Sequence, residues 1–226
     1  MIHRAARRTS ASPRCIVAWL ALALCAQAAA QDNAPASKTA AASAPSLSSD
    51  PDARHRLQGA ALLRALRDGG LVIYFRHTAT DFSKNDRAMR DYDDCANQRP
   101  LSEQGRSDAR AIGQRIAELQ LPIGVVMASP MCRTMEHARL MLGMATPTQA
   151  MRELSNGEYV GLRRLLSARV PAGSNRWMVG HGMPFRGVAG PPHLAEGEAA
   201  VLRPLGDAWI VLARLTVTDW SALKGS

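Results

Sequence analysis

One short buried strand constrains this chain more than any other feature. Residues 71–75 read Leu-Val-Ile-Tyr-Phe, a continuous apolar run that is typical of a buried strand. Arg76 and His77 follow directly, where such a strand should end, and the hydroxyl residues Thr78 and Thr80 come next. Because ligands of open α/β sheets bind beyond the carboxyl ends of the strands, this position suits a phosphate site. A histidine in an ordinary surface turn is the alternative, and the rest of the chain decides between the two.

Short apolar runs alternate with amphipathic segments through residues 54–226. Spacing of apolar residues and capping signals predict helices at 54–68, 103–119, 134–142, 159–168 and 183–190. Strands are predicted at 71–75, 125–128, 177–180, 199–203 and 209–216. Residues 81–100 are polar and charged and are expected to form a long loop, which in a compact domain is often functional. This alternation predicts an α/β fold with a mostly parallel sheet.

The first 53 residues are unlike the rest. Residues 1–30 combine arginines, an apolar stretch from Ile16 to Ala26 and small residues in an A-x-A pattern, which indicates a cleaved secretory signal. Residues 31–53 are mostly Ala, Ser, Pro and Asp, too polar to form a core, and are expected to be a disordered linker. We therefore expect a periplasmic or secreted protein with no stable membrane anchor, whose folded domain spans residues 54–226.

The net charge of +9 does not by itself indicate a nucleic-acid-binding protein. Residues 1–30 hold four of the 28 basic residues and no acidic one, so the remainder carries 24 basic against 19 acidic side chains. Aromatic residues are only 4% of the chain, and no basic run is interleaved with them. A mildly basic body suits small anionic substrates, and no nucleic-acid partner is expected.

Three predicted strand ends carry groups that bind or attack phosphate. They are Phe75-Arg76-His77-Thr78, Ser129-Pro130-Met131-Cys132-Arg133-Thr134 and Val179-Gly180-His181-Gly182. In this order and spacing, together with Pro100-Leu101-Ser102-Glu103-Gln104-Gly105, they resemble the histidine phosphatase superfamily over roughly residues 70–190, and export suggests a bacterial exported branch. The resemblance implies a three-layer, phosphoglycerate mutase-like α/β sandwich in which helices flank the sheet. It also implies a phosphomonoesterase.

The resemblance assigns a role to each of these residues. His77 is expected to be the nucleophile that forms a phosphohistidine intermediate, and the nearby arginines should disfavour its protonated form. Arg76 and Arg133 are expected to bind phosphate oxygens, with Thr80 adding a contact. His181 should stabilise the charge of the transition state. No metal or other cofactor is expected, because cationic side chains supply the positive charge.

The sequence offers three candidates for the general acid, because the position after the second histidine is Gly182 rather than an acidic residue. Glu153, in the segment Arg152-Glu153-Leu154, resembles the acid of the mutase-like branch and is our candidate. Glu158 and Asp81 are its rivals. The remaining histidines are expected to be structural or solvated: His3, His55, His137 and His193.

Two cysteines remain after removal of the signal, Cys95 and Cys132. In an oxidising compartment such a pair favours a disulfide, with two buried thiols as the alternative. The bridge would tie the 81–100 loop to the Arg133 turn. The expected substrate is a small-molecule or glycolipid phosphate ester. A catalytically weak phosphate-binding protein and a structural envelope protein remain alternatives, and the oligomeric state is not predicted.

Overall fold

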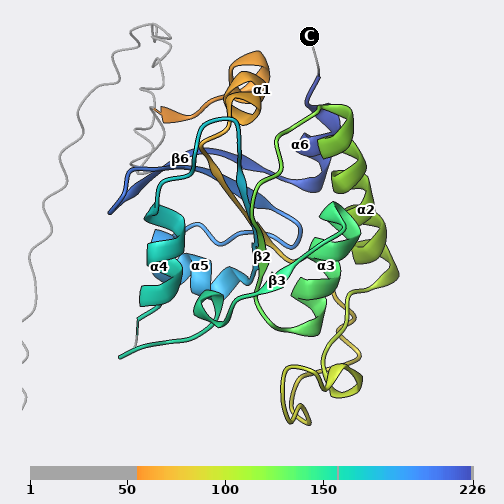
Figure 1. Cartoon of the computed structure of the whole chain (residues 1–226). Coiled ribbons are helices and arrows are strands. Elements are labelled where there is room, and N and C mark those ends of the chain that lie inside the picture. The colour runs from red at the N-terminus through yellow and green to blue at the C-terminus, as the bar shows by residue number, and fades with distance from the viewer. Residues whose placement is uncertain (1–54, 157, 225–226) are drawn as a thin grey trace, which may run out of the picture. The chain divides into compact units, whose positions relative to one another are not determined.

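Strand β1 (Val72–Arg76) lies inside a six-stranded sheet of order β3-β2-β4-β1-β5-β6 in the computed structural model (Figure 1), which describes residues 55–156 and 158–224. The signal and linker predicted over residues 1–53 lie outside the described residues. The other strands of the sheet are β2 (Val126–Ala128), β3 (Thr146–Pro147), β4 (Arg176–Gly180), β5 (Ala199–Pro204) and β6 (Trp209–Leu215).

The sheet is mostly parallel, as predicted. Strands β3, β2, β4 and β1 run parallel, whereas β5 pairs antiparallel with β1 and β6 pairs antiparallel with β5. The three strands that precede the predicted site residues are β2, β4 and β1, and they are direct neighbours. Their carboxyl ends therefore meet at one edge of the sheet, where parallel sheets bind ligands.

Helices cover both faces of the sheet, so the predicted three-layer α/β sandwich is confirmed (Figure 1). They are α1 (Gly59–Asp68), α2 (Glu103–Glu118), α3 (Cys132–Leu142), α4 (Val160–Ser167), α5 (Gly182–Ala189) and α6 (Val217–Ala222). Apolar residues of α1, α2, α3 and α6 share one core cluster with Phe75 and Trp177 of the sheet. Residues of α4 and α5 share the other with Tyr74 and Met178. The alternating sides of Tyr74 and Phe75 follow from the two-residue repeat of a strand.

Two local features fix how the helices meet the site edge. The side chain of Ser102 caps α2 by accepting a hydrogen bond from the Gly105 backbone N–H at 3.0 Å. A Cβ on Gly105 would lie 2.1 Å from the carbonyl oxygen of Ala79, so only glycine allows this close approach. The start of α2 is thereby held against the segment that follows His77.

The structure differs from the prediction mainly at element ends. Helix α1 begins at Gly59 rather than residue 54, because the Leu57 N–H donates to the carbonyl of Leu212 in β6. Helix α3 begins at Cys132, so Arg133 lies in its first turn. Strand β3 and helix α6 were not predicted. Both are very short, and α6 begins with a Thr216–Asp219 capping box that the pattern analysis overlooked.

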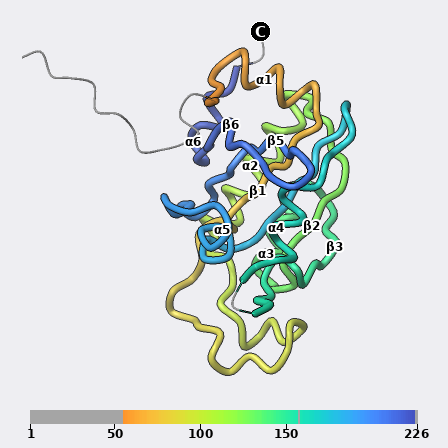
Figure 2. The backbone as a smooth tube through the Cα atoms, turned by 90° about the vertical axis from the view of Figure 1, so that its left-hand side faces the viewer, coloured from red at the N-terminus to blue at the C-terminus, as the bar shows by residue number. Residues whose placement is uncertain are grey.

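The 81–100 segment is a loop, as expected, interrupted only by a short 3₁₀ turn, η2 (Cys95–Asn97). In Figure 2 it extends from the site edge of the sheet, away from α1. A second 3₁₀ turn, η3 (Gln149–Met151), lies in the predicted irregular segment 147–158. These two segments provide site residues that no strand end supplies.

Candidate active site

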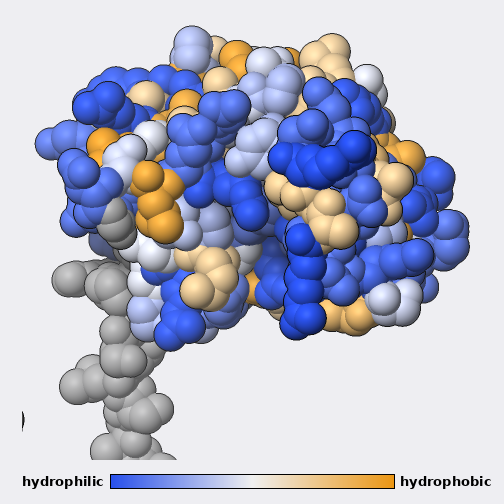
Figure 3. Space-filling model, turned by 90° about the horizontal axis from the view of Figure 1, so that it is seen from below, coloured by the Kyte–Doolittle hydropathy of each residue, from blue (hydrophilic) through white to orange (hydrophobic). Residues whose placement is uncertain are grey.

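A cleft of about 430 Å³ opens at the carboxyl edge of the sheet and brings four predicted residues together: Arg76, His77, Arg133 and His181. They come from the ends of β1 and β4 and from the first turn of α3 after β2. The face of the molecule on this side is hollowed, with hydrophilic surface around smaller hydrophobic patches (Figure 3). A larger cavity of about 700 Å³, between α1 and α6, holds none of these groups.

His77 is held in one tautomer. Its Nδ1 lies 2.9 Å from the carbonyl oxygen of Thr78, and since a carbonyl only accepts, Nδ1 must carry the proton. The other ring nitrogen, Nε2, is then unprotonated and carries a free lone pair. The side chain is only 3% exposed, and its ring centre lies 5.5 Å from that of His181. The geometry supplies an oriented imidazole nucleophile in a cleft lined with cations.

His77 is also held neutral. Burial lowers its pKa to about 3, and the charges of Arg133, Arg76 and Arg99 act in the same direction, against the hydrogen bond to Thr78. The expected effect of the arginines is therefore present, but loss of hydration is the larger cause. A neutral imidazole is the form that can attack phosphorus.

His181 is positioned by a tyrosine of the neighbouring strand. The Tyr74 hydroxyl donates to the His181 carbonyl at 3.0 Å and accepts from the His181 N–H at 2.9 Å. A Cβ on Gly180 would lie 2.1 Å from the Tyr74 oxygen, so glycine leaves room for this pair. The ring nitrogen Nε2 lies 2.8 Å from the Ser129 hydroxyl. Burial, more than the charges of nearby groups, lowers the pKa of His181 well below its usual value.

Arg76 is oriented by the segment that follows α5. Its Nη1 donates to the carbonyl of Leu194 at 2.9 Å, and its Nη2 lies 3.4 Å from Glu196 Oε1. The Thr80 hydroxyl donates to the same carboxylate at 3.1 Å. Thr80, predicted as a phosphate contact, does not line the cleft; in this structure it supports Arg76 through Glu196.

Arg133 is fixed by the 81–100 loop. Its Nη1 donates to Asp86 Oδ1 at 3.0 Å and lies 3.5 Å from the carbonyl oxygen of Arg99. The Arg99 N–H donates to the same Asp86 oxygen at 2.8 Å. Arg133 is 4% exposed, so its buried charge is compensated by a carboxylate that is itself only partly buried.

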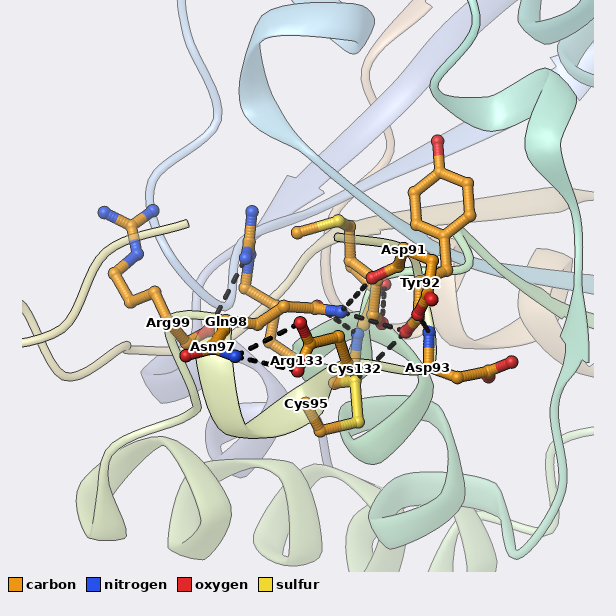
Figure 4. The surroundings of a disulfide bond; sticks show 12 residues. Asp91, Tyr92, Asp93, Cys95, Asn97, Gln98, Arg99, Cys132 and Arg133 are labelled. Atoms are coloured by element: carbon orange, nitrogen blue, oxygen red, sulfur yellow. Dashed lines mark hydrogen bonds between the residues drawn. A yellow bond between two sulfur atoms is a disulfide. The ribbon is translucent and has the colours of Figure 1, made fainter. Parts of the chain in front are cut away.

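A disulfide joins Cys95 to Cys132, the residue before Arg133 (Figure 4), which confirms the predicted bridge. Gln98 strengthens the connection between the loop and α3. Its Oε1 accepts from the Cys132 N–H at 2.9 Å, and its Nε2 donates to the Tyr92 carbonyl at 2.9 Å. The loop and the first turn of α3 therefore form one wall of the cleft.

No carboxylate of the described residues lines the cleft. Glu153 is exposed and lies between two residues that do line it, Arg152 and Leu154. Its rivals do not line the cleft either: Glu158 is exposed, and Asp81 accepts a hydrogen bond from the Ser83 N–H in the loop. The structure thus does not bring the predicted acid together with His77.

Sequence reasoning missed four polar residues of the cleft: Arg99, Arg152, Tyr159 and His193. Two of them had a detectable signal, because Arg99 directly precedes the Pro100-Leu101-Ser102 motif and Arg152 precedes the candidate acid. His193, expected to be structural or solvated, had none. Its place depends on how the chain after α5 folds back.

His137 supports the segment that carries His77 from within the core. It is completely buried, and its Nδ1 accepts a hydrogen bond from the Thr78 N–H at 3.2 Å. The Thr78 N–H thus binds His137 while the Thr78 carbonyl binds His77, so both backbone polar groups of Thr78 are held. Burial lowers the pKa of His137 to about 3, with a smaller effect from His77.

These buried histidines predict acid sensitivity. His77 and His137 have folded pKa values of about 3 against 6.5 when unperturbed, so between these values the unfolded chain binds more protons. The free energy of unfolding should therefore fall as the pH drops below about 6.5, by up to ~1.4 kcal/mol per pH unit for each histidine. Urea unfolding at pH 7.5, 6 and 5 measures this. The His77→Asn variant should show a shallower dependence and the exposed His55→Gln an unchanged one, whereas a flat profile would contradict both assignments.

Within residues 55–156 and 158–224, no three His, Cys, Asp or Glu side chains gather as a metal site would require. No helix in this part of the chain has the length and apolar character needed to span a membrane.

Comparison with known proteins places the site in context. Residues 72–190 match the family model described as the histidine phosphatase superfamily (branch 1). A comparison with curated proteins found no match. Similar solved structures include the protein histidine phosphatase SixA complexed with tungstate, with 16% identity, 66% of this chain and 98% of that chain covered, and a TM-score of 0.49. A mutant phosphoserine phosphatase from Entamoeba histolytica in complex with phosphoserine has 11% identity, the same coverages and a TM-score of 0.48. Bacillus stearothermophilus YhfR has 17% identity, 62% and 94% coverage and a TM-score of 0.44.

Proposed function

Since this chain belongs to the histidine phosphatase superfamily, we propose that it is a phosphatase that hydrolyses phosphate monoesters through a phosphohistidine on His77. The observation that carries the proposal is the buried, neutral His77 in a cleft that also holds Arg76, Arg133 and His181. Fixed donors and cations around a neutral nucleophile are what phosphoryl transfer requires.

The reaction has two displacements. In the first, the Nε2 lone pair of His77 forms a bond to phosphorus while the bond from phosphorus to the leaving oxygen breaks. In the second, a water oxygen forms the new bond to phosphorus as the phosphorus–nitrogen bond breaks, which releases inorganic phosphate and restores His77. Arg76 and Arg133 bind the non-bridging oxygens in both steps. The negative charge of a bound phosphate opposes the burial that keeps His181 neutral, and so favours its acting as a hydrogen-bond donor.

Export is part of the proposal. A disulfide persists in oxidising compartments, and the bridge between Cys95 and Cys132 joins the signal-like composition of residues 1–30 in supporting a periplasmic or secreted location. The substrate would be a small-molecule or glycolipid phosphate ester outside the cytoplasm.

The test is hydrolysis of p-nitrophenyl phosphate by the purified protein in excess chelator. We expect turnover to survive chelation, because four guanidinium groups line the cleft and supply its positive charge. Release of p-nitrophenolate is followed by absorbance, with and without chelator and then with divalent cations restored. Loss of activity on chelation that cations recover would overturn the metal-independent mechanism.

The acid-free cleft predicts a steep dependence on the leaving group. Aryl phosphates, whose leaving oxygen needs no proton, should react at least about tenfold faster than alkyl phosphates. Glu153→Gln should change alkyl phosphate hydrolysis by less than about threefold, because this side chain is exposed outside the cleft. The rates of p-nitrophenyl phosphate and glycerol 2-phosphate hydrolysis measure both effects. A tenfold loss in Glu153→Gln confined to the alkyl substrate would make Glu153 the acid.

The absence of a carboxylate from the described lining of the cleft also favours a second function. Without a positioned acid, the cleft could bind natural alkyl phosphates and turn them over poorly, which is the phosphate-binding alternative. Tight binding of inorganic phosphate together with negligible turnover of both aryl and alkyl esters would support it over the phosphatase.

A further inference from the structure

Two of the four cleft arginines form no ion pair with an acidic side chain among the residues that the structure describes. Arg76 is paired with Glu196 and Arg133 with Asp86, so each guanidinium near His77 is held by a carboxylate. Within the part of the chain that the structure describes, Arg99 and Arg152 form no ion pair, although both line the cleft. Unpaired cations repel one another, so such an arrangement has an energetic cost that an anionic ligand would remove.

Arg99 is built into the cleft wall beside Arg133. Its backbone N–H is bound by Asp86 and its carbonyl lies 3.5 Å from the Arg133 guanidinium. Its own guanidinium carbon lies 4.7 Å from the centre of the Phe82 ring, and its Nε is buried without a hydrogen-bond partner. In Figure 4 the Arg99 and Arg133 side chains both point away from the disulfide. The position of Arg99 is therefore fixed, while the carboxylate that its charge acts on, Asp86, is already paired with Arg133.

Arg152 approaches from a different segment. It follows η3, and its N–H donates to the Gln149 carbonyl at 2.8 Å. Burial is the main cause that lowers the pKa of both Arg133 and His181, and the charge of Arg152 adds to the shift in each. Arg152 is thus close enough to the phosphate-binding groups to repel them, yet no described carboxylate compensates it.

We propose that Arg99 and Arg152 form a second anion subsite, so that the cleft selects substrates carrying another phosphate or a carboxylate near the scissile phosphate. This inference rests on the proposed function, which assigns the first phosphate to Arg76 and Arg133. A phosphate monoester with no second anionic group would leave the guanidinium groups of Arg99 and Arg152 without an anionic group to bind. A substrate with two anionic groups neutralises both pairs, and arginine's planar fork suits either phosphate or carboxylate.

Matched phosphonates test the subsite without turnover. Methylphosphonate carries one anionic group, methylenediphosphonate carries a second phosphonate, and phosphonoacetate carries a carboxylate. Isothermal titration in excess chelator measures their binding to the purified protein. We expect at least one of the two bifunctional ligands to bind at least tenfold more tightly than methylphosphonate, and the tighter one identifies the second group as phosphate or carboxylate.

Variants assign the preference to the two arginines. Arg99→Gln and Arg152→Gln should each reduce the ratio of affinities, and the double variant should bring it below about threefold. The exposed Arg110→Gln on α2 is the matched control and should leave the ratio unchanged. Thermal unfolding confirms that each variant is folded.

Two results would overturn the inference. One is equal binding of all three phosphonates, and the other is a preference that survives in the folded double variant. Either result could accompany normal hydrolysis of p-nitrophenyl phosphate, so the subsite can fail while the phosphatase stands. Conversely, a protein that hydrolyses nothing but shows the arginine-dependent preference would keep the subsite and lose the proposed function.

Discussion

Replacing His77 by alanine is expected to reduce hydrolysis of p-nitrophenyl phosphate at least about 1,000-fold, because removing a covalent nucleophile leaves only binding and electrostatic stabilisation. No other described side chain combines its features: His77 is buried, keeps Nε2 unprotonated through the Thr78 carbonyl, and shares a cleft with four arginines. His181 cannot substitute, because its Nε2 is engaged by Ser129 at 2.8 Å.

Two controls separate chemistry from folding. His55→Ala changes an exposed histidine that does not line the cleft, and it should retain full activity. His77→Asn keeps a polar side chain of similar size and should be as inactive as His77→Ala, with a comparable unfolding midpoint. In addition, the unmodified chain quenched during turnover should hold acid-labile phosphate on His77. Equal activity of His77→Ala and the unmodified chain would rule out this residue as the nucleophile.

Removing the disulfide is expected to have the largest effect on stability. The bridge between Cys95 and Cys132 closes a loop of 37 residues. In the chain-entropy model this stabilises the fold by ~4 kcal/mol, which for a domain of this size corresponds to a fall of roughly 10–15 °C in the unfolding midpoint. The double variant Cys95→Ser with Cys132→Ser should show this fall in thermal unfolding monitored by circular dichroism.

The same change should weaken substrate binding, because Asp86 and Arg99 reach Arg133 from the loop that the disulfide ties down. We expect KM for p-nitrophenyl phosphate to rise several-fold in the double serine variant, with a smaller change in kcat, since His77 directly follows β1 and does not belong to the loop. Reducing agent should lower the midpoint of the unmodified chain and leave that of the serine variant unchanged. A reductant effect of equal size on both would show that it acts elsewhere.

The sequence alone was sufficient for the fold class and for the centre of the site. Apolar runs of strand length alternate with segments of helical period, and that alternation predicts a layered α/β sheet. Because the carboxyl ends of neighbouring parallel strands meet, residues that follow such runs are expected to meet as well. Arg76, His77, Arg133 and His181 do so in the structure. The disulfide was predictable because only two cysteines lie beyond residues 1–30, the predicted signal.

The loops were decided only by the tertiary structure. Neither Arg99 nor Arg152 lies on a strand or in a helix with a readable period, and Arg99 is placed by contacts with residues 13 and 34 positions away in the chain. Glu153 is exposed because the turn after η3 directs its neighbours into the cleft instead. The Tyr74 hydroxyl binds the backbone of a residue 107 positions away, a contact no local pattern encodes.

One physical reason explains why the strand ends were predictable from the sequence and the loop residues were not. Hydrogen-bond periodicity and apolar burial are local properties, so short windows of sequence determine the strands, the helices and the groups at their ends. Which loop side chains face the cleft depends instead on long-range hydrogen bonds and ion pairs, which exist only once the sheet has brought distant segments together. The sequence therefore determined the position of His77, the proposed nucleophile, and of the arginines beside it. Only the folded chain decided that two further arginines lie in the cleft and that the expected acid lies outside it.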